Sequence, residues 1–176
     1  MQHIITDPQC ETQDSFNPLE RWILGFMKDE RDMIFVRTAA KITFMVLPLA
    51  ALLFMLPPLA VFALALPYLA FVFVGFGGRY GLMLHAVGHR SVFRKEHQWI
   101  EGYIPWCLGP FLGHTPTSFE AHHVFMHHAE NNMLGDGSCT MRYQRDHFGH
   151  FVHYWGRFFF LGYFHLGRYM WLRGRN

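Results

Sequence analysis

The longest pattern along the chain is an apolar run from residue 42 to residue 78 that contains no charged side chain. Because about 20 residues cross the hydrocarbon core of a bilayer, this run is long enough for two helices. Pro57 and Pro58 divide it, since a proline pair fits poorly inside a helix and restricts the residue before it. The pattern therefore predicts a transmembrane hairpin at 38–84, with spans of about 38–56 and 59–84.

Lysine and arginine flank the predicted hairpin but are missing from its turn. Membrane proteins carry an excess of these residues on the cytoplasmic side, so both ends of the hairpin are expected there. We therefore expect an integral membrane protein, of the bacterial inner membrane or the endoplasmic reticulum. The residues behind this expectation are Arg31, Arg37 and Lys41 before the uncharged run and Arg79, Arg90, Arg94 and Lys95 after it.

Helices are also expected outside the hairpin. Asn17, Pro18 and Glu20 form a typical helix start, with a cap residue, a proline in the first turn and a carboxylate at the third position. Residues 99–118 are apolar but broken by glycine and proline, which favours short helices half-buried at the membrane interface. Thr117 or Ser118 is suited to cap the next helix.

Composition narrows the class of protein. The chain is 51% hydrophobic and 18% aromatic, and its 15 Lys and Arg nearly balance its 13 Asp and Glu. No clustered basic face for nucleic acid appears. The cysteines Cys10, Cys107 and Cys139 are too far apart for a thiolate metal motif. Acidic residues near the start argue against a signal peptide, so the internal segments are expected to direct insertion.

Histidines are concentrated after the hairpin, in the runs His85-Ala-Val-Gly-His89 and His123-Val-Phe-Met-His127-His128. Residues four apart on an α-helix are about 40° apart around its axis, so each run points a pair of imidazoles one way. His128 is expected about 100° further round, towards a second ion or another side of the same one. Two metal ions between two helices would fit this layout, and imidazole suits iron, zinc, copper or nickel.

Other polar residues near these runs have weaker links to a metal. His122 is expected to support the site from outside the ligand set, or to be structural. Asp136 and Asp146 are candidates for carboxylates that orient imidazoles, although a solvated loop charge is the commoner case. His147, His150 and His153 recur beside aromatic residues, which favours interfacial packing.

The order of two spans, H-x-x-x-H and then H-x-x-x-H-H resembles the membrane fatty-acid desaturase superfamily. The segments 18–22, 127–132 and 140–146 are also similar to parts of one desaturase-like branch. The resemblance implies an all-α integral membrane enzyme with two iron ions, which uses O2 to place a double bond in an acyl chain. Its iron ligands would include His85, His89, His123, His127 and His128. Ferredoxin or a b-type cytochrome would supply electrons.

The family has a third histidine box that these residues do not contain, because His147, His150, His153 and His165 include no adjacent pair. The resemblance therefore implies the N-terminal half of such an enzyme. We expect a single domain over 1–176, with a cytoplasmic segment at 1–37, the hairpin at 38–84 and the histidine region at 85–149. Residues 150–176 would start a further membrane or interfacial helix.

Three alternatives remain at this stage. Related hydroxylases, alkane monooxygenases and carotenoid ketolases use similar boxes. A membrane electron carrier with a bis-histidine haem belongs to another class, although haem needs one ligand from each side rather than clustered pairs. A metal transporter should carry polar ligands inside its spans, and 42–78 has no charged residue.

Overall fold

The structure is a computed structural model that describes residues 15–174. Helices make up 76%, and the described residues form no β-strand, which confirms the all-helical prediction. Cys10, Arg175 and the acidic residues of the first positions lie outside the described residues. The α-helices are α1 (Pro18–Leu24), α2 (Met33–Lys41), α3 (Leu47–Met55), α4 (Pro58–Val72), α5 (Gly78–His89), α6 (Ser118–Glu120), α7 (His128–Glu130) and α8 (Phe148–Leu172).

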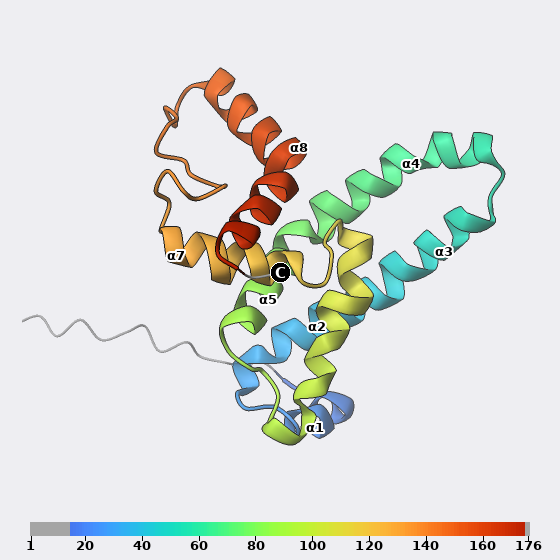
Figure 1. The fold of residues 1–176 in the computed structure, drawn as a ribbon. Coiled ribbons are helices and arrows are strands. Elements are labelled where there is room, and N and C mark those ends of the chain that lie inside the picture. Colours follow the sequence, from blue (N-terminus) through green and yellow to red (C-terminus); the bar gives the residue numbers. More distant parts are fainter. Residues whose placement is uncertain (1–14, 175–176) are drawn as a thin grey trace, which may run out of the picture.

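Short 3₁₀ and π segments join many of these helices. The 3₁₀ segments are η1 (Glu30–Asp32), η4 (Lys95–Gly102) and η6 (Gly109–Leu112), and the π segments are η2 (Ile42–Val46), η3 (Phe73–Gly77), η5 (Ile104–Leu108) and η7 (Ala121–His127). Figure 1 shows the result as a long hairpin, α3 and α4, that extends away from the end of the molecule holding α1.

The predicted start of α1 is confirmed. The Asn17 side chain accepts a hydrogen bond from the Glu20 amide at 2.9 Å, and the Glu20 carboxylate accepts one from the Asn17 amide at 2.9 Å. This reciprocal pair satisfies two backbone donors that a helix N-terminus leaves free. Glu20 also pairs with Arg37 of α2 at 2.7 Å. Glu20 therefore takes part in the cap of α1 and also connects α1 to α2.

Two continuous helices, Glu30–Met55 and Pro58–His89, are long and apolar enough to cross a membrane. They meet at the predicted division, where Leu56 and Pro57 are extended and Pro58 begins α4. Both helices are longer than the predicted spans, so the first begins inside the segment expected to be cytoplasmic. The apolar run marked the membrane-length part of each helix but not its ends, because charged residues such as Arg79 are readily accepted in a helix.

The segment 95–112 packs along the base of the hairpin. Ile104, Leu108 and Leu112 are buried against Ile42, Val46, Val72, Phe76, Tyr80, Met83 and Leu84. The Tyr80 hydroxyl donates to the Ile104 carbonyl at 3.1 Å, and the hydroxyls of Thr43 and Tyr103 lie 2.8 Å apart. Trp99 and Trp106 stay exposed. The expected short helical segments are therefore present, and their place at a membrane interface stays a prediction.

The last long helix, α8, lies beside the helix of the second histidine run (Figure 1). Its Phe158 ring contacts His122 at 5.2 Å between centroids. Near its other end, the Tyr169 hydroxyl and Arg173 both donate to Glu130, at 2.8 and 2.6 Å. α8 is not among the membrane-length apolar helices of residues 15–174. α8 begins at Phe148, two residues before the predicted start of a further helix at 150. The contacts of Phe158 and Tyr169 connect α8 to the histidine region at two points.

Candidate metal centre

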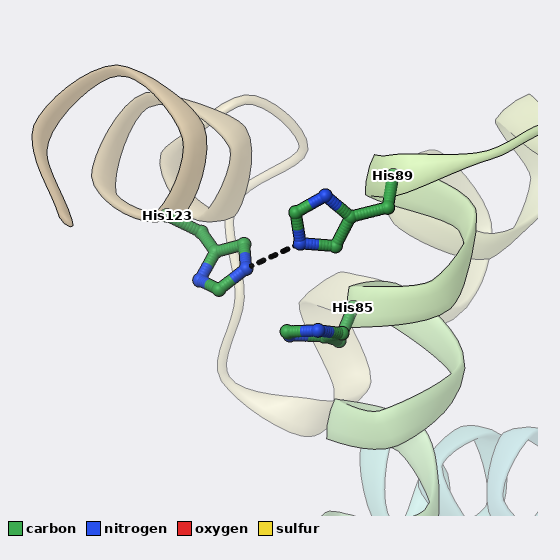
Figure 2. Close-up of side chains that lie close together, drawn as sticks. All are labelled: His85, His89 and His123. Atoms are coloured by element: carbon green, nitrogen blue, oxygen red, sulfur yellow. Dashed lines mark hydrogen bonds between the residues drawn. The ribbon is translucent and has the colours of Figure 1, made fainter. Parts of the chain in front are cut away.

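The first histidine run lies on the last turns of α5. His85 and His89 are both exposed, and their ring centroids are 4.6 Å apart. Met83, Leu84 and half-buried Val87 pack into the core, so the histidines occupy the opposite face of the helix. This is the arrangement that the four-residue spacing predicts. Figure 2 shows both rings projecting from α5 towards His123 on a separate helix.

The second run lies on η7 and α7. Thr117 occupies the cap position but makes no side-chain cap bond, and the Ser118 hydroxyl instead donates to the Thr115 carbonyl at 2.9 Å. Over 121–127 the helix widens to a π-helix, in which the His128 amide donates to the His123 carbonyl. A π-helix has more residues per turn than an α-helix, so positions five apart return to one face. The widened turn therefore brings the His128 ring beside that of His123, with 4.6 Å between centroids, rather than about 100° further round the helix as expected.

His89, His123 and His128 meet through their Nε2 atoms. These atoms lie 3.0 Å apart for His89 and His123, 3.1 Å for His123 and His128, and 3.2 Å for His128 and His89. The three distances form an almost equilateral triangle. Its corners come from the two helices that the sequence pattern indicated.

No placement of protons gives a hydrogen bond along all three sides of this triangle. A single ring nitrogen either carries a proton or presents a lone pair. With three nitrogens in mutual contact, at least one pair must oppose two lone pairs or two N–H groups. A cation among them removes the conflict, because all three nitrogens can then present lone pairs to it.

The size of the triangle fits one transition-metal ion. Two nitrogens bound to an ion at about 2.1 Å in perpendicular directions lie about 3.0 Å apart. The observed separations of 3.0 to 3.2 Å match that value. His85 extends the group, since the ligand atoms of His85, His89 and His123 all lie within 4.8 Å of one another. An all-imidazole donor set suits iron, zinc, copper and nickel alike.

His127 lies beside the triangle and turns towards a carboxylate. Its ring centroid is 5.7 Å from that of His123, and its Nδ1 lies 2.6 Å from the Asp136 carboxylate. Because the ionised carboxylate can only accept, Nδ1 donates to Asp136, and in the neutral imidazole the lone pair then lies on Nε2. A carboxylate on the far nitrogen is the usual support of a metal-binding histidine. Asp136 thus stands where the sequence analysis expected an orienting residue.

Asp136 is itself held by its neighbours. It is 4% exposed and accepts hydrogen bonds from the Ser138 amide at 2.8 Å and the Ser138 hydroxyl at 2.7 Å. Burial raises the pKa of its carboxyl, but the bonds from Ser138 and His127 outweigh burial and hold that pKa below its ordinary value. Ser138 is not among the residues predicted from the sequence. The Asp-Gly-Ser order was the available signal, because an Asp side chain often bonds the amide two residues on.

A left-handed turn brings Asp136 back to His127. Asn131 and Asn132 have φ values of 47° and 62°, a region that asparagine tolerates better than most residues. The Asn132 side-chain oxygen accepts from the Thr140 backbone amide at 2.7 Å. The Asn132 backbone amide donates to the Asp136 carboxylate at 3.2 Å. The asparagine pair therefore ends the helix that carries the second histidine run.

The surroundings of His123 lower the pKa of its imidazole and so favour the neutral form that binds metals. Burial, followed by the nearby rings of His85, His128 and His89, lowers its pKa to about 4. At neutral pH its imidazole is therefore uncharged. A metal ion would not have to displace a proton from it.

Several candidates lie apart from the cluster. His122 packs on Phe158 and stacks 6.3 Å from His127, and burial lowers its pKa. Asp146 is exposed in the turn before α8, and no bond to a histidine is found for it among residues 15–174. His147 caps α8 by accepting from the His150 amide at 3.3 Å, and the His153 ring packs on Tyr143. Asp146 therefore does not fill the orienting role considered for it.

Comparisons of the chain with protein-family models, with curated proteins and with solved structures gave no match.

Proposed function

We propose that this protein is a membrane oxidoreductase with histidine-bound iron, and specifically a desaturase of lipid acyl chains that uses two iron ions and O2. The triangle of Nε2 atoms from His89, His123 and His128 carries the proposal, because a shared cation relieves contacts that protons cannot satisfy. The resemblance of both histidine runs to desaturase boxes supplies the choice of iron.

In this proposal His89, His123 and His128 would hold one iron ion. His85 and His127, which lie beside this triangle, would help to hold the second iron ion. Asp136 fixes the ring of His127 through Nδ1, so that Nε2 faces the metal. Bound iron would supply the oxidant that hydrogen removal from an unactivated methylene requires. The chain contributes position and charge state through its neutral His123.

Membrane insertion of the hairpin is part of the proposal. The outer faces of both long helices are strongly apolar, with Phe54 and Val74 each 88% exposed and Leu59 83% exposed. Exposed apolar surface on this scale marks a site of membrane or protein contact. With positive charge at both hairpin ends, the histidines would lie at the cytoplasmic surface, where acyl chains of the bilayer can reach them.

The reaction also requires an electron donor. Removing two hydrogens from an acyl chain supplies two of the four electrons that reduce O2 to two waters. Two further electrons, with two protons, must come from a carrier such as ferredoxin or a b-type cytochrome. A partner that docks transiently at the cytoplasmic face is therefore part of the proposed cycle.

The haem alternative fits this geometry poorly. Two axial nitrogens on one haem iron lie on opposite sides of the macrocycle, about 4 Å apart, which is twice a metal–nitrogen bond. The Nε2 atoms of His89 and His123 are 3.0 Å apart and leave no space for a porphyrin between them. A non-haem ion is the better occupant.

The first test measures metal. The gene product is expressed in bacterial membranes, purified without oxygen and analysed for bound metals by mass spectrometry. We expect two irons per chain, and a loss of at least one in His89→Ala and in His128→Ala. His97→Ala is the matched control, because that ring packs 4.8 Å from Phe26 and away from the cluster. Metal-free protein, or equal iron in all variants, contradicts the proposal.

The second test identifies the reaction. Membrane lipids from cells that express the protein together with an electron donor are compared by mass spectrometry with lipids from cells that carry His89→Ala. New double bonds that depend on His89 support a desaturase. Hydroxylated lipid alone would replace the desaturase assignment by a hydroxylase one and leave the metal site standing.

A further inference from the structure

The chain leaves α5 in an extended loop directly after His89. We call residues 90–94 the His89 loop. Arg90 ends the helix with φ −149° and ψ 143°, so no further helical turn supports the last histidine from behind. His89 is exposed, and packing alone holds its ring weakly. The position of this ligand therefore depends on what fixes the loop.

A buried carboxylate holds the first residue of the loop. Both oxygens of Asp32 accept from the Arg90 guanidinium, from Nη1 and Nη2, at 2.5 Å each. The side chain of Asp32 is 3% exposed, whereas that of Arg90 is 53% exposed. Asp32 lies at the very start of α2. The two-point contact thus fastens the residue after His89 to the first long helix.

A second carboxylate holds the middle of the loop. One oxygen of Glu101 accepts from the Ser91 hydroxyl at 2.7 Å and from the amides of Val92 and Phe93 at 2.8 Å each. Glu101 belongs to η4, which packs along the hairpin base. Three donors on one oxygen fix the loop backbone in direction as well as position.

The loop is also paired on its other edge. The Lys28 amide donates to the Val92 carbonyl at 2.9 Å, and the Arg94 amide donates to the Phe26 carbonyl at 2.8 Å. Val92 and Phe93 are buried at 2% and 8% exposure. The loop is therefore held by backbone pairing with residues 26–28 as well as by the carboxylates of Asp32 and Glu101.

We propose that Asp32 and Glu101 are positioning residues for His89, which set the metal affinity of the site without touching the metal. The inference rests on the proposed function, because it assumes that the histidines bind an ion. A bound metal tolerates ligand displacements of only about 0.5 Å, and supports of metal ligands typically contribute about 10- to 100-fold in affinity. The histidine pattern singled out neither residue, since Asp32 lies 57 residues before His89 and Glu101 lies 12 residues after it.

The test compares metal affinity among variants of the purified protein in lipid nanodiscs. Co²⁺ is the probe, because its visible absorption reports the ligands as well as the amount bound. We expect the dissociation constant to rise at least about tenfold in Asp32→Asn and in Glu101→Gln, with an altered absorption band. Asp29→Asn and Glu96→Gln are matched controls. Asp29 pairs with Arg31 near the surface, and Glu96 is exposed on the same segment as Glu101.

Hydrogen exchange separates positioning from general unfolding. Faster exchange of the Val92 and Phe93 amides, with unchanged exchange in α5 and η7, is expected in Glu101→Gln. If Asp32→Asn fails to fold, Arg90→Lys replaces it, because lysine keeps the charge but loses the two-point contact. We expect an intermediate affinity for that variant.

The outcomes distinguish the two proposals. Wild-type protein that binds no Co²⁺ overturns the proposed function. Wild-type protein that binds Co²⁺ while Glu101→Gln and the folded Asp32 or Arg90 variant bind it equally well overturns the positioning role alone. Equal weakening in the two control variants would also overturn it, since general surface charge would then be the cause.

Discussion

The end of α5 and the η7–α7 segment bring histidines to the same place by different means. On α5 the helix is regular, and its histidines are exposed at the end of a long continuous helix. On η7 the helix is widened, and His127 is bonded to a buried carboxylate. The first half of the site is positioned by backbone and loop, and the second by a network of side chains. Substitutions should therefore affect the two halves differently.

The largest difference in metal affinity is expected between alanine substitutions of His123 and of His85. His123→Ala removes a corner of the triangle, so metal affinity should fall at least about 100-fold, whereas His85→Ala removes a neighbour of the triangle and should cost about tenfold. Co²⁺ titration followed by absorption measures both. A loss in His85→Ala as large as that in His123→Ala would show that the triangle is not the centre of the site.

On the η7–α7 half of the site a carboxylate is bonded directly to a histidine ring, so its loss should weaken metal binding. Asp136→Asn leaves His127 without its charged partner and is expected to weaken metal binding about 10- to 100-fold. Asp146→Asn is the matched control, because Asp146 is exposed and apart from the histidines. Co²⁺ titration of both variants gives the ratio. Equal affinities in the two variants would remove the Asp136 network from the metal site.

The smallest effect is expected at the turn that returns Asp136 to the cluster. Asn132→Ala loses the bonds to Thr140 and places alanine at φ 62°, which should destabilise the fold by about 1–2 kcal/mol. Asn132→Gly should recover part of that loss, since glycine adopts this φ freely. Thermal unfolding in nanodiscs measures both. If the glycine variant is the less stable, the left-handed conformation is not the limiting feature.

The sequence predicted the parts of this molecule that follow from local spacing. The hairpin, its division at Pro57–Pro58, the cap of α1 and the pairing of His85 with His89 all depend on neighbours within a few turns. The direction of the His128 ring was predicted wrongly because the widening of η7 is not visible in residue type, whereas its assignment as a metal ligand stays a prediction. The contact of Asp32 with Arg90 was missed because it joins residues 58 apart along the chain, and those of Glu101 because the loop conformation that turns the Val92 and Phe93 amides to one carboxylate is not visible in residue type. Membrane insertion and iron chemistry stay predictions.

The helix Pro58–His89 has 32 residues, which corresponds to a length of about 48 Å at 1.5 Å per residue. Its uncharged part, residues 58–78, is about 32 Å long, close to the roughly 30 Å hydrocarbon core of a bilayer, so in the proposed topology the last turns would stand beyond the core and the helix would tilt as the local thickness changes. Because His85 and His89 are on the last turns of this helix, a change in its tilt would displace them relative to the helix that holds His123. Bilayer thickness would then tune how closely the two halves of the cluster meet, so that the physical state of the membrane would feed back on the chemistry at its surface.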